Sequence, residues 1–227
     1  MSAIAEPSYR NRVGYQAAIL GGFTMVAAAF LVVGNIATRD AIEQRRTEDL
    51  LASLSQVIPA RIHDNDLLAH PLAIPQGSGK TVTVYRALRG HTVTGVAYRI
   101  TGQGYGGEIQ LILGLNARGE VLGARVLAHA ETPGLGDKIE AERDDWILGF
   151  EGRSLGSPPI ERWAVRKDGG DFDQFSGATI TPRTVVGAIK HGLEFFRDHR
   201  DTLLASAVIQ ETPAEGNATQ PRLGNRQ

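Results

Sequence analysis

The sequence contains no cysteine and no excess of charge of either sign. Without cysteine the chain cannot form disulfides, thiolate zinc sites, cysteine-ligated iron–sulfur clusters or c-type haem attachments, so any redox chemistry requires another cofactor. Its 227 residues include 24 Lys and Arg against 25 Asp and Glu, a net charge of −1. A nucleic-acid partner is not expected, because phosphate contacts require a basic excess.

Charged residues are also absent from Val13 to Thr38. A helix of that length, at about 1.5 Å per residue, exceeds the ~30 Å hydrocarbon core of a bilayer. We interpret residues 13–36 as one transmembrane helix. A cleaved secretory signal is the alternative, although its apolar region is usually shorter. Arginines on both sides of the segment leave its orientation open.

Strand-like patterns occupy the middle of the chain. Residues 81–100 are rich in β-formers and have a turn at 89–90. Residues 108–128 form a clearer hairpin pattern, with a turn at 116–119. The sequence therefore predicts an antiparallel sheet.

Helical patterns flank these strands. Apolar spacing predicts a stalk helix over 37–60 that continues out of the membrane, and a further helix over 137–150. A strong helix is expected from Thr181, with Thr181 as its N-cap and Pro182 at the first helical position. Together these elements predict the α+β class.

Two glycine-rich segments imitate nucleotide-binding motifs. Residues 75–81 resemble the end of a P-loop, but Ile74 stands where glycine is needed, and 68–75 is not a convincing strand. Residues 102–107 spell G-x-G-x-x-G, but the strand-like 108–113 follows where a dinucleotide site needs a helix. Neither nucleotide fold is expected, and a flexible loop and a glycine-rich corner are the simpler interpretations.

A third motif has a context that fits its chemistry. The small residues Ser176, Gly177 and Ala178 precede Thr179 and leave its hydroxyl accessible, just before the strong helix. Unpaired amides and the positive end of the helix dipole favour a phosphate at such a position. The alternative is that Thr181 caps the helix and Thr179 merely fills the loop.

This motif and the segment His129–Glu140 closely resemble the G subunit of the Rnf electron-transport complex and, more distantly, the C subunit of the sodium-translocating NADH:quinone reductase. The resemblance covers about residues 10–205. In that family the pattern Asp-x-x-Ser-Gly-Ala-Thr is the acceptor for a flavin transferase, and FMN is joined through its phosphate to the threonine. The resemblance therefore implies a phosphoester to FMN at Thr179 and recognition of Asp173 by the transferase.

The resemblance also implies a location and partners. It places the C-terminal domain on the periplasmic side of a bacterial cytoplasmic membrane, anchored by a single pass through the bilayer, among other subunits of a complex whose electron flow drives ion movement. The expected parts are a short cytoplasmic N-terminus (1–12), a transmembrane helix (13–36), a stalk helix (37–60), an FMN-binding domain (61–208) with an antiparallel sheet flanked by helices, and a disordered tail (209–227).

Further flavin contacts are hypotheses on the same basis. Glycines allow close approach of a ring system, and no catalytic residue or metal ligand is expected. The candidate contacts are Glu131, Thr132, Gly134, Leu135, Tyr105, Gly106, Ser176, Gly177 and Ala178.

Two other functions remain open. The C subunit of the quinone reductase would perform the same flavin chemistry with different partners. An exported, anchored sensor domain would use the helix start as an anion site without redox work.

Overall fold

The computed structural model describes residues 13–76 and 79–205. The chain divides into two compact units, Met1–Ala52 and Ser53–Gln227, each of which is described by itself. The predicted N-terminus (1–12) and the predicted tail (209–227) lie outside the described residues.

The first unit contains most of α1 (Val13–Val57), which covers the predicted transmembrane helix and most of the predicted stalk. Its segment Val13–Arg39 is long and apolar enough to cross a membrane, and its most apolar window is not buried within the described structure. The helix ends just before Pro59, whose ring and missing N–H do not fit a helix interior.

Five strands form one antiparallel sheet, in their chain order. Their bounds are β1 (Leu72–Pro75), β2 (Thr81–Arg89), β3 (Thr92–Gln103), β4 (Glu108–Asn116) and β5 (Val121–Ala128). Both predicted hairpins are confirmed. Residues 68–75, interpreted above as an unconvincing strand, do contain one: Leu72 pairs with Val84, and β1 is the edge strand.

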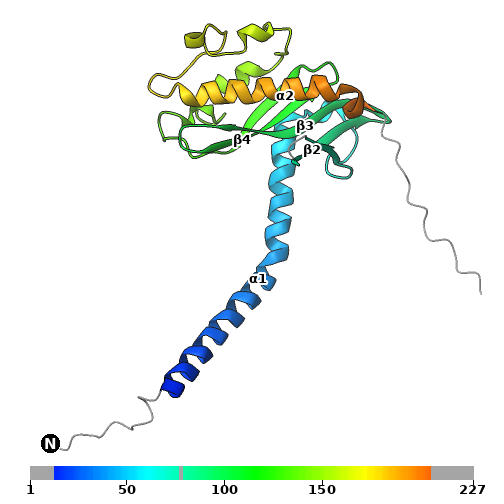
Figure 1. The fold of residues 1–227 in the computed structure, drawn as a ribbon. Helices are drawn as coiled ribbons and strands as arrows, with labels where there is room; N and C mark the ends of the chain where they lie inside the picture. The colour runs from blue at the N-terminus through cyan, green and yellow to red at the C-terminus, as the bar shows by residue number, and fades with distance from the viewer. Residues whose placement is uncertain (1–12, 77–78, 206–227) are drawn as a thin grey trace, which may run out of the picture. The chain divides into compact units, whose positions relative to one another are not determined.

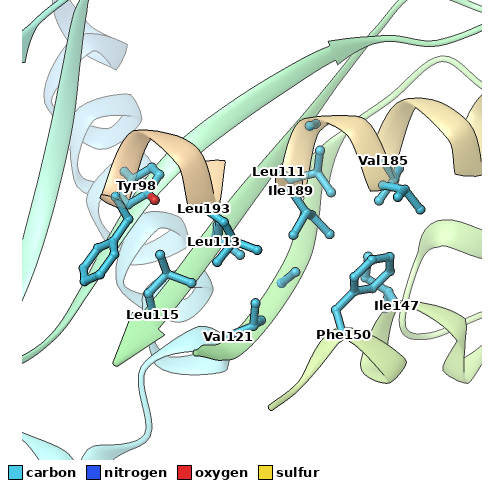
Figure 2. Packing of buried hydrophobic residues seen from close by; sticks show 14 of the residues in the cluster. Tyr98, Leu111, Leu113, Leu115, Val121, Ile147, Phe150, Val185, Ile189 and Leu193 are labelled. Atoms are coloured by element: carbon cyan, nitrogen blue, oxygen red, sulfur yellow. The ribbon is translucent and has the colours of Figure 1, made fainter. Parts of the chain in front are cut away.

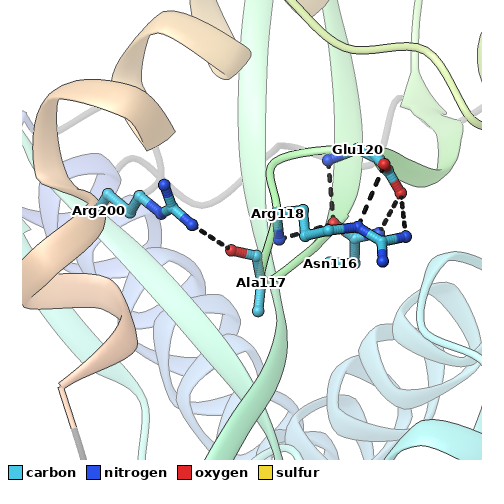
Figure 3. A network of polar contacts seen from close by, with 5 residues as sticks. All are labelled: Asn116, Ala117, Arg118, Glu120 and Arg200. Atoms are coloured by element: carbon cyan, nitrogen blue, oxygen red, sulfur yellow. Dashed lines mark hydrogen bonds and ion pairs between the residues drawn. The ribbon is translucent and has the colours of Figure 1, made fainter.

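The β4–β5 turn is fixed by a side chain (Figure 3). Asn116 Oδ1 accepts the N–H groups of Arg118 at 2.8 Å and Glu120 at 3.0 Å, which is how asparagine stabilises a turn. The Arg200 guanidinium donates to the carbonyl of Ala117 at 3.3 Å. The turn is therefore also tied to the last helix.

The segments between β5 and that helix are short. They include the 3₁₀ helices η3 (Asp137–Ile139), η4 (Asp145–Phe150), η5 (Ile160–Arg162) and η6 (Arg166–Asp168); η2 (Ala60–Ile62) follows α1. The single helix predicted over 137–150 is thus wrong. The backbone of Asp144 is extended, and its side-chain Oδ1 accepts the N–H of Trp146 at 2.9 Å. Asp144 therefore caps the start of η4 and does not continue a helix from η3.

Helix α2 (Ile180–Leu204) crosses one face of the sheet over β3 and β4 (Figure 1). Gly192 allows close approach, since a Cβ there would lie 2.7 Å from Leu113 Cδ2. The Tyr98 hydroxyl donates to the Gly192 carbonyl at 2.7 Å, and burial raises the pKa of Tyr98 far above its ordinary value, so the phenol remains a donor. Figure 2 shows the core packed between helix and sheet.

The last turn of α1 packs on the opposite face of the sheet. Leu54, Val57 and Ile58 are buried there. Gly114 and Gly123 form a cross-strand pair beneath them, and a Cβ on Gly114 would lie 2.2 Å from the Val57 carbonyl oxygen. Adjacent strand residues face opposite sides, so Gly114 faces this turn while Leu113 faces α2.

An aromatic cluster holds the segments that lead into α2. Phe150 stacks on Phe172 with centroids 4.7 Å apart, and Trp163 lies 4.9 Å from Phe172. Trp146 meets Phe175 edge to face at 5.1 Å. Such pairs contribute about 0.5–1.5 kcal/mol each beyond the area they bury.

Candidate functional site

Three segments from distant parts of the sequence meet at one cavity: the β3–β4 loop, the loop after β5, and the start of α2. The cavity has a volume of about 280 Å³. It is lined by Tyr105, Glu131, Thr132, Leu135, Gly136, Gly177, Ala178, Thr179, Ile180 and Thr181.

Most of the predicted site residues are brought together here, and some are not. Gly106, Gly134, Ser176 and Asp173 do not line the cavity, although Gly106 contacts one of its walls. Ile180 was not predicted as a site residue, and Thr181 was predicted as the helix N-cap, whereas both line the cavity. A signal for Ile180 existed, because it is a large apolar residue directly after the small-residue motif.

Thr179 stands at the N-terminus of α2. It is the N-cap residue, its carbonyl accepts the N–H of Arg183 at 3.3 Å, and its side chain makes no capping hydrogen bond. The prediction that Thr181 is the N-cap is therefore wrong. Helical hydrogen bonding begins two residues earlier, and Thr181 is buried inside the first turn. The hydroxyl of half-buried Thr179 is not used for capping.

The loop before Thr179 is held by its aromatic residues and by one glycine. Phe172 and Phe175 are buried, and the Ala178 N–H donates to the Phe175 carbonyl at 3.2 Å. Gly177 has φ +83°, a left-handed conformation that L side chains rarely adopt. This turn carries the chain from the aromatic cluster to the helix start.

Asp173 lies on the outside of the same loop. Its exposed carboxylate pairs with Arg166 at 2.8 Å, and its carbonyl accepts the Trp146 Nε1–H at 2.9 Å. The backbone is thus fixed to the aromatic cluster while the carboxylate faces solvent, where another protein can reach it.

Glu131 joins the three segments. Only 5% of it is exposed. Its Oε1 accepts the Gly106 N–H at 3.0 Å, and its Oε2 accepts the hydroxyl of Thr181. One carboxylate therefore connects the loop after β5 to the β3–β4 loop and to α2.

A second set of polar contacts supports Glu131 from behind. The Glu131 N–H donates to His129 Nδ1 at 3.0 Å, so the ring proton is assigned to Nε2, which donates to Glu140 Oε1 at 2.8 Å. Arg143 Nε lies 3.3 Å from Glu140 Oε2. The hydrogen bond from His129 first, and that from Arg143 next, lower the pKa of Glu140.

The cavity rim is apolar. Beyond α1, the large apolar side chains that remain exposed among the described residues are Tyr105 (73%), Leu135 (44%) and Ile180 (45%), and all three line this cavity. The described ranges 13–76 and 79–205 contain no group of three His, Cys, Asp or Glu placed to hold a metal ion. The arrangement suits a flat apolar ring with a phosphate at the helix start.

Comparison with known proteins identifies this domain. The FMN-binding domain family matches residues 104–194. The G subunit of the ion-translocating oxidoreductase complex of Cereibacter sphaeroides is 55% identical over 192 residues, 85% of this chain and 88% of the relative. That of Stutzerimonas stutzeri is 46% identical over 188 residues, 83% and 82% of the two chains.

Among solved structures, the crystal structure of Shewanella oneidensis NqrC aligns at 22% identity with a TM-score of 0.45, covering 66% of this chain and 73% of that chain. The two relatives named above share far higher identity over most of their length. The chain therefore belongs to the family formed by the G subunits of ion-translocating oxidoreductase complexes and contains an FMN-binding domain.

Proposed function

We propose that this chain carries electrons within an Rnf-type ferredoxin–NAD complex coupled to ion translocation, with FMN bound through a phosphoester to Thr179. The observation that carries the proposal is the Thr179 hydroxyl, which makes no capping bond and stands at a helix start on an apolar-rimmed cavity. Family membership supports the electron-transport role, and the names of the relatives support other subunits as partners.

The attachment is a phosphoryl transfer to Thr179 Oγ1. FAD holds the FMN phosphate in an anhydride with AMP, so the oxygen forms a new P–O bond, the anhydride P–O bond breaks, AMP leaves with the electron pair, and the hydroxyl proton is lost. The product phosphodiester retains one negative charge. The first amides of α2, on Ile180 and Thr181, have no intrahelical partner and suit this charge.

The cavity would hold and orient the flavin ring. Tyr105, Leu135 and Ile180 present apolar surface, and removing that surface from water is worth roughly 25 cal/mol per Å². FMN, when bound, supplies the electron acceptance and donation, and the protein supplies position and electrostatics. Glu131 places a carboxylate in the wall, which disfavours added negative charge on a nearby ring.

Location is part of the proposal. Segment Val13–Arg39 of α1 would anchor the chain in the bacterial cytoplasmic membrane, with the FMN domain on the periplasmic side. Protease added to intact spheroplasts should then remove the domain. If the domain is instead protected from the protease until the membrane is opened, it lies on the cytoplasmic side and the proposed orientation is wrong.

The attachment is tested by denaturing electrophoresis under ultraviolet light, after coexpression with a flavin transferase. The wild-type band should fluoresce, and Thr179→Ala should be dark. Thr202→Ala is the matched control, because it removes an exposed threonine hydroxyl of α2 that does not line the cavity and lies outside the motif, and it should stay fluorescent. A dark wild-type band would reject the covalent carrier and leave a reversible anion-binding domain as the better description.

A further inference from the structure

Glu131 is an unusual side chain for the interior of a small domain. The two hydrogen bonds that the structure gives its carboxylate come from neutral donors, the Gly106 N–H and the Thr181 hydroxyl. Removing a carboxylate from water carries a large desolvation penalty when no cation compensates it. Such a group is more readily explained by a task at the cavity than by stability.

The surrounding backbone leaves room for this side chain. A Cβ on Gly104 would lie 2.3 Å from Glu131 Oε1, and a Cβ on Gly136 would lie 2.8 Å from Glu131 Cβ. Two loops therefore have glycine where any other residue would collide with the Glu131 side chain, at its carboxylate from Gly104 and at its Cβ from Gly136. His129 holds the Glu131 backbone at the same time.

The carboxylate is linked to the start of α2, where Thr179 lies, by its hydrogen bond from Thr181. Thr181, whose hydroxyl it binds, is 1% exposed and belongs to the same first turn as Thr179. Holding Thr181 fixes that turn against the β3–β4 loop. The backbone of this turn sets the direction of the Thr179 Cα–Cβ bond, and with it the positions that the uncapped hydroxyl can reach.

We propose that Glu131 is a positioning residue for flavin attachment, which holds the first turn of α2 so that Thr179 Oγ1 faces the incoming phosphorus. The inference rests on the proposed function. It assigns Glu131 a role in maturation that does not require contact with the flavin.

Substitutions at position 131 separate geometry from charge. In Glu131→Gln, the amide oxygen can accept the Gly106 N–H, and the amide nitrogen can donate to the Thr181 hydroxyl, which is also an acceptor. Both hydrogen bonds of the side chain are thereby retained without the negative charge. Glu131→Ala removes both hydrogen bonds. Thr181→Val removes the hydrogen bond between Thr181 and Glu131 by deleting the hydroxyl, and Thr181→Ser keeps it.

The test measures flavin incorporation into the purified full-length chain by a purified flavin transferase supplied with FAD. Because a small misplacement of reacting groups can cost on the order of 100-fold in rate, Glu131→Ala and Thr181→Val should lower kcat about 10- to 100-fold. KM for the chain should stay within about twofold, because Asp173 and its loop are unchanged. Glu131→Gln and Thr181→Ser should retain near wild-type kcat.

Three outcomes would overturn the inference: wild-type kcat in Glu131→Ala, wild-type kcat in Thr181→Val, or loss of kcat in Glu131→Gln equal to that in Glu131→Ala. Tryptophan fluorescence reports whether each variant is folded. If Glu131→Ala is unfolded, the comparison of kcat between Thr181→Val and Thr181→Ser tests the inference in its place. A wild-type chain that accepts no flavin would instead reject the proposed function, so the two failures are distinguishable.

Discussion

Gly177 offers a quantitative test of how the loop before Thr179 is built. Its φ of +83° costs an L residue roughly 1–2 kcal/mol. Space is not the obstacle, because a Cβ there would lie 3.7 Å from its nearest neighbour, Leu135 Cδ2. Alanine also restricts the unfolded chain, which returns about 0.4–1 kcal/mol. Gly177→Ala should therefore destabilise the domain by about 1 kcal/mol.

Gly187 provides the matched control. It lies inside α2, and a Cβ there would have nothing within 4 Å. Because alanine is the better helix former, Gly187→Ala should stabilise by about 0.5–1 kcal/mol. The same added methyl is thus expected to have opposite effects at these two positions.

Thermal unfolding of the detergent-solubilised full chain, followed by tryptophan fluorescence, measures both changes. The two tryptophans, Trp146 and Trp163, belong to the aromatic cluster and report on this domain. At about 2–4 °C per kcal/mol, Tm should fall by about 2–4 °C in Gly177→Ala and rise by about 1–4 °C in Gly187→Ala. An unchanged or raised Tm in Gly177→Ala would refute the left-handed turn.

The remaining predictions concern packing and pH. Gly114→Ala should lower the free energy of unfolding, measured in urea, by about 1–3 kcal/mol, because its Cβ would collide with the Val57 carbonyl. An unchanged free energy of unfolding would mean that the last turn of α1 does not pack there. Phe150→Ala should cost about 3–5 kcal/mol by the same measurement, since a fully buried ring leaves a cavity. The hydrogen bond from His129 lowers the pKa of Glu140 in the folded protein. The ionised Glu140 carboxylate therefore stabilises the fold fully above its ordinary pKa of 4.5, and this contribution is lost as the pH falls through the lowered pKa of the folded state. Glu140→Gln should flatten this acid dependence, and an unaltered pH profile would contradict it.

Those parts of the fold that depend on local patterns could be predicted from the sequence. Both hairpins follow from alternating strands and from turn residues such as Asn116, whose side chain organises its own turn. Helix α2 follows from apolar spacing. Strand β1 was missed because four residues at a sheet edge, ending at Pro75, carry little signal without their partner β2. The break at Asp144 depends on a single capping bond that periodicity does not register.

The candidate site was predictable only in part. The motif around Thr179 can be recognised in the sequence, but its N-cap position depends on where helical hydrogen bonding begins. The bond between Thr181 and Glu131 joins residues 50 apart in the chain and follows from tertiary packing. No local pattern distinguishes a threonine that caps a helix from one that donates to a buried carboxylate.

The central claim is that FMN is esterified to Thr179. Peptide mass spectrometry of the full chain, purified after coexpression with a flavin transferase, tests it most directly. The peptide containing Thr179 should gain the mass of FMN less one water, with fragment ions placing the addition on Thr179. An unmodified Thr179 peptide from flavin-containing protein, or an addition on Ser176 or another residue, would contradict it.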